Sequence, residues 1–133
     1  MTADPSAMLD LTGRRLLVVE DEELIGMMLV DLLQDLGAQA LGPASTAADA
    51  LAMAETEGLS AALLDLSLKG EMSYPIADRL AERGVPFIFI TGYGQGHIVP
   101  RHAAVPLLTK PFGPRQLADA LTRLAWPQPG DGR

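Results

Sequence analysis

The sequence predicts an α/β fold in which a five-stranded parallel sheet is covered by helices on both faces, a doubly wound three-layer sandwich. Short apolar runs alternate along the chain with longer segments of helical period, which is the pattern of parallel βαβ units. Several of the short runs are apolar at every position, as strands buried on both faces are. The length of 133 residues suits one domain with one core.

The elements are expected in the order strand, helix, strand, helix, strand, helix, strand, loop, strand and helix. The expected strands are residues 16–19, 39–41, 61–64, 87–90 and 105–108. Helical segments are indicated by apolar residues at spacings of three and four, and glycine or proline follows each segment. The expected helices are residues 23–36, 46–57, 73–83 and 114–126.

One connection lacks the pattern of a helix. Residues 93–100 contain two glycines and a proline where the fourth helix of the alternation belongs, and both residue types disfavour helix. We therefore predict that this fourth helix is short, displaced or mobile. His97 and His102 in the same connection are expected to be exposed to solvent.

The expected domain covers residues 14–126, with residues 1–13 as an N-terminal extension and residues 127–133 as a C-terminal tail. Leu9 and Leu11, together with Met8, could dock an N-terminal turn against the domain, and the pattern leaves this open. Trp126 is expected to cover the end of the last helix.

Composition excludes several classes of protein. The chain has 10 basic and 17 acidic residues, and the basic residues form no stripe that could follow a nucleic-acid backbone. It has no cysteine, so disulfide scaffolds and thiolate metal sites are excluded. Neither a signal peptide nor an apolar run long enough to cross a bilayer is present, so we expect a cytoplasmic protein with no membrane partner.

Polar side chains follow four of the expected strands at the point where each strand ends. Glu20 and Asp21 follow the first strand, Asp65 the third, Thr91 the fourth and Lys110 the fifth. The carboxyl ends of parallel strands share one edge of the sheet, which is where open α/β sheets bind ligands. We therefore expect these side chains to converge on one pocket.

Three carboxylates in one pocket repel one another, so either their pKa values rise or a cation binds. An all-oxygen ligand set favours Mg²⁺. A carboxylate beside Mg²⁺ can attack a phosphoryl group and form an aspartyl phosphate. Lys110 and the metal would neutralise the phosphoryl oxygens, and the Thr91 hydroxyl could donate a hydrogen bond to one of them.

These motifs, in this order and at strand ends, resemble the receiver domain of bacterial two-component response regulators. The resemblance covers roughly residues 14–126 and is carried by four segments: Leu16-Leu17-Val18-Val19-Glu20-Asp21-Glu22, Leu63-Leu64-Asp65-Leu66, Thr91-Gly92 and Lys110-Pro111-Phe112. It implies a flavodoxin-like fold with strand order 2-1-3-4-5.

The resemblance also implies a role for each site residue. Asp65 would be the phosphoacceptor, Thr91 the switch hydroxyl, and Lys110 a contact of the phosphoryl group. Asp21 would ligate Mg²⁺ directly and Glu20 through water or as a second ligand. The metal ligands would be completed by the backbone carbonyl of Ser67, and the peptide bond before Pro111 would be cis.

The function implied is that of a single-domain response regulator, a phosphoacceptor that assists its own phosphorylation and dephosphorylation but is not an enzyme. Its phosphoryl donor would be a sensor histidine kinase or a histidine phosphotransfer protein. Its output would be protein–protein interaction with an unknown downstream protein, or the relay and draining of phosphoryl groups as a shuttle or sink.

Residues 86–94 are similar to the FAT GUY group of receivers, with Ile90 in place of the alanine of that motif. Most receivers carry a switch aromatic where this chain has Leu107. We therefore expect Tyr93, two residues after Thr91, to take over signalling, and its bulk suggests slow loss of the phosphoryl group.

Three other functions are alternatives to this one. A pseudo-receiver would keep the fold as an interaction module that works without phosphorylation. A flavodoxin-like electron carrier needs a phosphate-cradling loop after the first strand, where this chain has acids that would repel the cofactor. A haloacid-dehalogenase-type phosphatase needs a second acid two residues after Asp65, where Ser67 stands.

Overall fold

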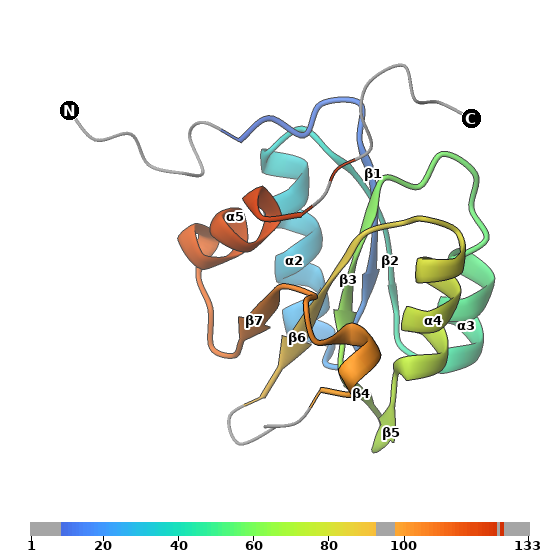
Figure 1. The fold of residues 1–133 in the computed structure, drawn as a ribbon. Coiled ribbons are helices and arrows are strands. Elements are labelled where there is room, and N and C mark those ends of the chain that lie inside the picture. Colours follow the sequence, from blue (N-terminus) through green and yellow to red (C-terminus); the bar gives the residue numbers. More distant parts are fainter. Residues whose placement is uncertain (1–8, 93–97, 125, 127–133) are drawn as a thin grey trace.

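The structure of the chain is a computed structural model, which describes residues 9–92, 98–124 and 126 (Figure 1). Its strands are β1 (Arg15–Val19), β2 (Gln39–Ala44), β3 (Ala61–Asp65), β4 (Ser67–Leu68), β5 (Glu71–Met72), β6 (Phe87–Thr91) and β7 (Leu107–Thr109). Its helices are α2 (Glu23–Asp35), α3 (Ala47–Met53), α4 (Tyr74–Glu82) and α5 (Pro114–Thr122), with a short 3₁₀ helix, η1 (Pro100–His102).

Five strands form one sheet in the order β2-β1-β3-β6-β7, and every neighbouring pair in it is parallel. Counting only the strands of this sheet along the chain, the order is 2-1-3-4-5. The predicted α/β fold and its strand order are therefore confirmed.

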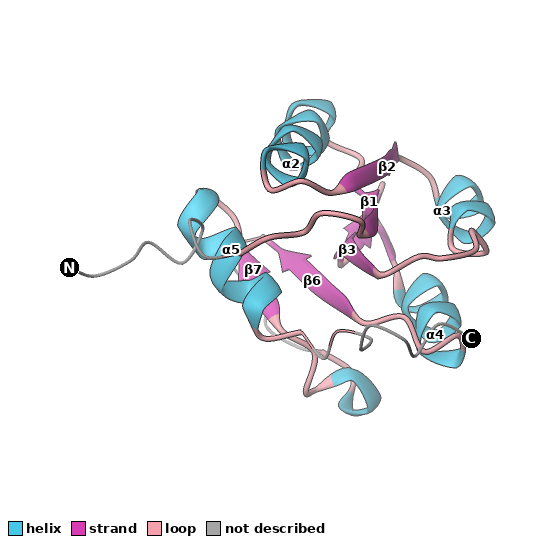
Figure 2. Cartoon of the chain, turned by 90° about the horizontal axis from the view of Figure 1, so that it is seen from above, coloured by secondary structure: helices cyan, strands magenta, loops and turns pink. Residues whose placement is uncertain are grey.

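Helices cover both faces of the sheet, with α2 and α5 on one face and α3 and α4 on the other (Figure 2). Alternate residues of a strand point to opposite faces. In β1, Leu16 and Val18 accordingly join the core beneath α2 and α5, whereas Leu17 and Val19 join the core beneath α3 and α4. All four are fully buried, as the continuously apolar run predicted.

Two helices are shorter than the sequence predicted. The predicted helix 46–57 ends at Met53, where the guanidinium of Arg83 donates hydrogen bonds to the carbonyls of Ala54 and Thr56 and holds the chain in a turn. The last helix ends at Thr122, and Trp126 donates from its indole N–H to the carbonyl of Leu121 (2.9 Å). In the described part of the chain, no helix combines the length and apolar character that crossing a bilayer requires.

Between β6 and β7, the described residues 98–106 contain only η1, which agrees with the predicted short, displaced or mobile fourth helix. Residues 93–97, with Tyr93 and His97, lie outside the described residues. The expectation that His102 is exposed is wrong, because its side chain is 6% exposed. Its ring lies 5.5 and 5.9 Å from those of Phe87 and Phe89, and its Nε2 lies 2.8 Å from Asp78.

Asp78 also accepts two hydrogen bonds from Arg101 (2.8 and 3.0 Å), and we call Asp78, Arg101 and His102 the histidine cluster. At the other end of the chain, Leu11 is 1% exposed and its N–H donates to the carbonyl of Leu36 (2.8 Å). The segment predicted as an N-terminal extension thus contributes a core residue.

Candidate functional site

The first two acids of the site directly follow β1. The backbone N–H of Glu20 donates to the carbonyl of Ala44 in β2 (2.9 Å), so the sheet hydrogen bonding extends one residue beyond the strand. The Glu20 side chain is buried, and its Oε2 accepts a hydrogen bond from the N–H of Glu22 (3.0 Å). Asp21 is half-buried beside it.

The parallel register brings the other predicted residues to the same edge. Asp65 is the last residue of β3 and Thr91 the last of β6, and each is only 4% exposed. Lys110 follows β7, and its backbone N–H donates to the carbonyl of Thr91 (2.8 Å). Its peptide bond to Pro111 is cis.

The ammonium of Lys110 lies among three carboxylates. Its Nζ is 3.1 Å from Oε1 of Glu20, 3.3 Å from Oδ2 of Asp65 and 3.3 Å from Oε2 of Glu22. The Lys110 side chain is 18% exposed, so the positive charge is largely withdrawn from water. Glu22 was not singled out as a site residue by the sequence analysis, although it belongs to the acidic run that starts at Glu20.

The pKa values reflect this crowding. Burial of Glu20, followed by the neighbouring carboxylate of Asp65, raises the pKa of Glu20 to about 8. For Lys110, burial alone would lower the pKa, but hydrogen bonding to Glu20 and the charge of Asp65 outweigh it, so the pKa is raised. Lys110 therefore stays charged, and negative charge exceeds positive charge in the site.

Glu20, Asp21 and Asp65 lie close enough together to hold one cation. Each offers one carboxylate oxygen, and the three oxygens lie within 4.8 Å of one another. Among the described residues, no hydrogen bond of acceptable geometry reaches Oε1 of Glu20, although Nζ of Lys110 is close to it. A buried carboxylate oxygen without a hydrogen bond is unfavourable, and a hard cation would satisfy it. We call Glu20, Asp21, Asp65 and Lys110 the acidic site.

The remaining predicted residues lie near this edge or beyond the described chain. Ser67 begins β4, and its N–H donates to Oδ1 of Asp65 (3.2 Å). Leu107 begins β7 and is 42% exposed. Tyr93 lies outside the described residues.

The short strands β4 and β5 form an antiparallel hairpin that the sequence analysis did not predict. The hairpin starts two residues after Asp65 and lies at the lower end of the sheet in Figure 1. The backbone N–H of Lys69, in its turn, donates to Oδ2 of Asp21 (2.7 Å). Every residue type except proline has a backbone N–H, so the sequence does not indicate which residue makes this contact.

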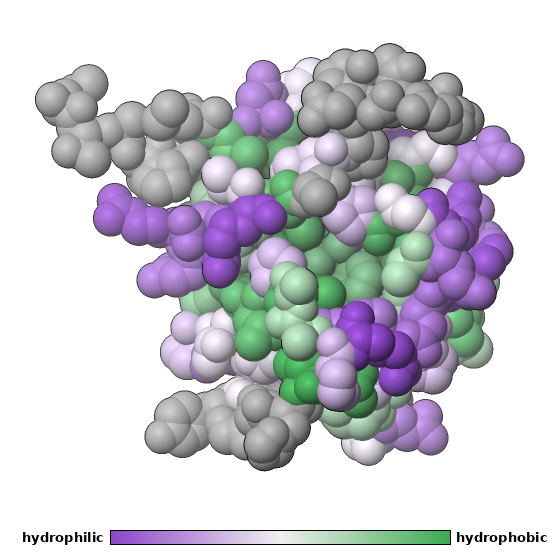
Figure 3. Space-filling model, in the orientation of Figure 1, coloured by the Kyte–Doolittle hydropathy of each residue, from purple (hydrophilic) through white to green (hydrophobic). Residues whose placement is uncertain are grey.

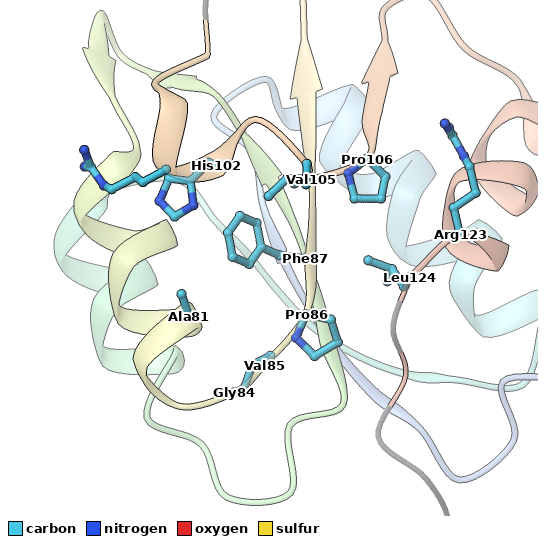
Figure 4. A pocket seen from close by; sticks show the side chains of 12 residues that line it. Ala81, Gly84, Val85, Pro86, Phe87, His102, Val105, Pro106, Arg123 and Leu124 are labelled. Atoms are coloured by element: carbon cyan, nitrogen blue, oxygen red, sulfur yellow. The ribbon is translucent and has the colours of Figure 1, made fainter.

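A separate cavity of about 420 Å³ opens near the start of β6 (Figure 4). Phe87 and Leu124 contribute to its lining, and Arg101 and Arg123 bring charge to it. Apolar residues gather on the same face of the molecule, between α5 and α4 (Figure 3). None of the acidic-site residues lines this cavity, so it is not where the carboxylates act.

Comparison with known proteins identifies the family of the chain. The model of the response regulator receiver domain matches residues 16–122. The solution structure of SdrG from Sphingomonas melonis Fr1 is 44% identical, with a TM-score of 0.75, and the match covers 82% of this chain and 93% of that one. A second SdrG structure, its BeF3-activated conformation, is 42% identical with a TM-score of 0.70 and covers 86% and 97%.

Two curated relatives match over 112 residues, which is 81% of this chain. The transcriptional regulatory protein PdtaR of Mycobacterium tuberculosis is 29% identical, and the phyllosphere-induced regulator PhyR of Methylorubrum extorquens is 32% identical. The chain spans about half the length of these relatives, 55% and 42% respectively. Because the receiver domain model matches residues 16–122, most of the sequence, the chain belongs to the response regulator receiver domain family.

Proposed function

We propose that the chain is a single-domain response regulator in which Asp65 accepts a phosphoryl group from a histidine kinase or a histidine phosphotransfer protein. One observation carries the proposal. The buried carboxylate of Asp65 lies beside the ammonium of Lys110 and next to a carboxylate oxygen of Glu20 that accepts no hydrogen bond from any residue the structure describes. The site thus combines a nucleophile, a fixed positive charge and unfilled capacity for a cation.

In the proposed reaction, a carboxylate oxygen of Asp65 attacks phosphorus and forms the acyl phosphate bond. The bond between phosphorus and the imidazole nitrogen of the donor breaks, and the electron pair leaves with the donor. Lys110 binds a non-bridging phosphoryl oxygen, because its ammonium is already 3.3 Å from the Asp65 carboxylate. The buried hydroxyl of Thr91, at the end of the adjacent strand, donates a hydrogen bond to another.

Glu20, Asp21, Asp65 and the carbonyl of Ser67 are the residues that would hold Mg²⁺, which when bound supplies neutralisation of the phosphoryl charge. Before the reaction, these residues keep several oxygen ligands, the type that Mg²⁺ prefers, close together at the edge of the sheet. Lys110 limits their mutual repulsion until a cation binds.

The output belongs to the same proposal. Phosphorylation would be read by a partner protein or passed on, with Thr91, Tyr93 and Leu107 as the switch positions, in the cytoplasm. Two facts about SdrG support this: a BeF3-activated conformation of it is known, and this chain covers nearly all of it. The exposed side chain of Leu107 supports a role at a surface that changes on phosphorylation.

The proposal is tested by incubating the purified protein with Mg²⁺ and acetyl phosphate and measuring the intact mass. We expect a gain of one phosphoryl group that disappears when Mg²⁺ is chelated. The variant Asp65→Ala should show no gain, whereas Asp119→Ala, which removes an exposed carboxylate of α5, should behave as the wild type. A wild-type protein that gains no mass, and shows no spectral change with beryllofluoride, would be a pseudo-receiver.

A further inference from the structure

The hairpin of β4 and β5 follows the phosphoacceptor position and is anchored at its base. Its strands pair Ser67 with Met72 and Leu68 with Glu71. Leu68 is 3% exposed and packs in the core beneath α3 and α4. The N–H and the hydroxyl of Ser73 both donate to the carbonyl of Leu66, at 2.9 and 3.1 Å. These contacts fix the position of the hairpin relative to the edge of the sheet.

The turn of the hairpin has an uncommon backbone conformation. Lys69 has a φ of 49° and Gly70 a φ of 85°, and positive φ at both central residues is what a type I′ turn requires. Among the described residues, Lys69 is the only residue other than glycine with positive φ. A side chain at positive φ is unfavourable, so the turn persists because its surroundings favour it.

That conformation delivers a hydrogen bond to the acidic site. The N–H of Lys69 donates to Oδ2 of Asp21 at 2.7 Å, across 48 positions of sequence. A carboxylate has two oxygens and about four lone-pair sites. The bond therefore restricts the orientation of the Asp21 carboxylate and leaves lone pairs on both of its oxygens able to bind a cation.

We propose that the β4–β5 hairpin is a positioning element of the cation site: the backbone N–H of Lys69 orients the Asp21 carboxylate, so order in the hairpin and binding of a divalent cation are coupled. The coupling is reciprocal: if the ordered hairpin raises the affinity for the cation, then cation binding stabilises the ordered hairpin by the same free energy. Lys69 is a positioning residue that acts through its backbone and not through its ammonium. This inference rests on the proposed function only in requiring that the site binds Mg²⁺.

Two glycines of the chain allow a matched test. A Cβ added at Gly70 or at Gly84, which follows α4, would meet nothing within 4 Å, and their φ angles are similar, at 85° and 71°. Alanine at either position therefore costs backbone energy without a steric clash. Gly70→Ala loosens the hairpin turn, whereas Gly84→Ala imposes the same kind of strain on a turn without contact to the acidic site.

The measurement is the dissociation constant of the full chain for Mg²⁺ alone, by calorimetric titration. We expect Gly70→Ala to weaken Mg²⁺ binding by about two- to fivefold, which is the size of a glycine backbone effect. Gly84→Ala should bind as the wild type does. Lys69→Gly, which keeps the N–H and removes the strain at positive φ, should bind as tightly as the wild type or more tightly.

A second measurement is hydrogen exchange of the Lys69 amide in the wild-type protein, which Mg²⁺ should slow. Equal Mg²⁺ affinity in Gly70→Ala and Gly84→Ala, or an exchange rate that Mg²⁺ leaves unchanged, overturns the coupling and leaves the proposed function intact. Absence of Mg²⁺ binding to the wild type overturns both.

Discussion

The acidic site and the histidine cluster both pair carboxylates with basic side chains, yet their charges balance differently. In the acidic site, the ammonium of Lys110 faces the carboxylates of Glu20 and Asp65 and that of the neighbouring Glu22. In the histidine cluster, one carboxylate faces a guanidinium and an imidazole ring. The pKa of Glu20 is raised to about 8 by burial and by Asp65, whereas hydrogen bonds from Arg101 and then His102 lower the pKa of Asp78 to about 2.

The two clusters also differ in their contact with water. The Glu20 side chain is fully buried, whereas that of Asp78 is 42% exposed. Burial without enough positive charge is the less favourable arrangement for a carboxylate. The acidic site therefore has room for a positive charge that its own side chains do not supply. The histidine cluster is satisfied by its own residues and serves to hold η1 against α4.

Removing the positive charge from each cluster should give the largest difference between them. Without metal, Lys110→Met should lower the free energy of unfolding by about 2–3 kcal/mol, because buried carboxylates lose their ammonium. Arg101→Met should lower it much less, because the ion pair of Arg101 with Asp78 is exposed to solvent. Urea unfolding in chelator measures both. Excess Mg²⁺ should restore part of the loss in Lys110→Met only, and equal losses in the two variants would contradict the comparison.

Neutralising one carboxylate in each cluster should change stability in opposite directions. Without metal, Asp65→Asn should raise the free energy of unfolding by about 1–2 kcal/mol, because it relieves repulsion from nearby carboxylates. Asp78→Asn should lower it by about 1 kcal/mol, because Arg101 and His102 lose a charged acceptor. Thermal unfolding in chelator measures the sign. A loss of stability in Asp65→Asn would show that, without metal, the attraction of Asp65 to Lys110 outweighs its repulsion from the other carboxylates.

The contrast also explains what the sequence could predict. Apolar runs located the carboxyl ends of β1, β3, β6 and β7 to within one residue. The rule that parallel strands share an edge then placed Glu20, Asp65, Thr91 and Lys110 together. No similar rule applied to the hairpin, whose strands have two residues each and no measurable periodicity.

The histidine cluster depends on contacts between distant segments. His102 is buried against rings from α4 and β6 and lies 2.8 Å from a carboxylate 24 positions away in the chain. Its local sequence indicates only a loop. The predicted strand 39–41 is shorter than β2, which extends to Ala44, for a related reason. Gly42 and Pro43 disfavour a strand locally, yet Pro43 packs so closely on α2 that a Cβ at Gly26 would lie 2.8 Å from it.

Acid should remove the contribution of Asp78, the smallest effect expected. The pKa of this carboxyl is lowered from 3.8 to about 2 on folding, so the stability that it contributes is present above pH 3.8 and is lost as the pH falls through 2. Because the group is partly exposed, that contribution is about 1 kcal/mol or less. The difference in unfolding free energy between the wild type and Asp78→Asn should therefore be constant near neutral pH and shrink below about pH 4. The same comparison with Asp119→Asn, an exposed carboxylate 3.9 Å from Arg123, should show little difference at any pH. A difference for Asp78→Asn that does not change with pH would mean that the contacts of its neutral form, and not its charge, hold η1 in place.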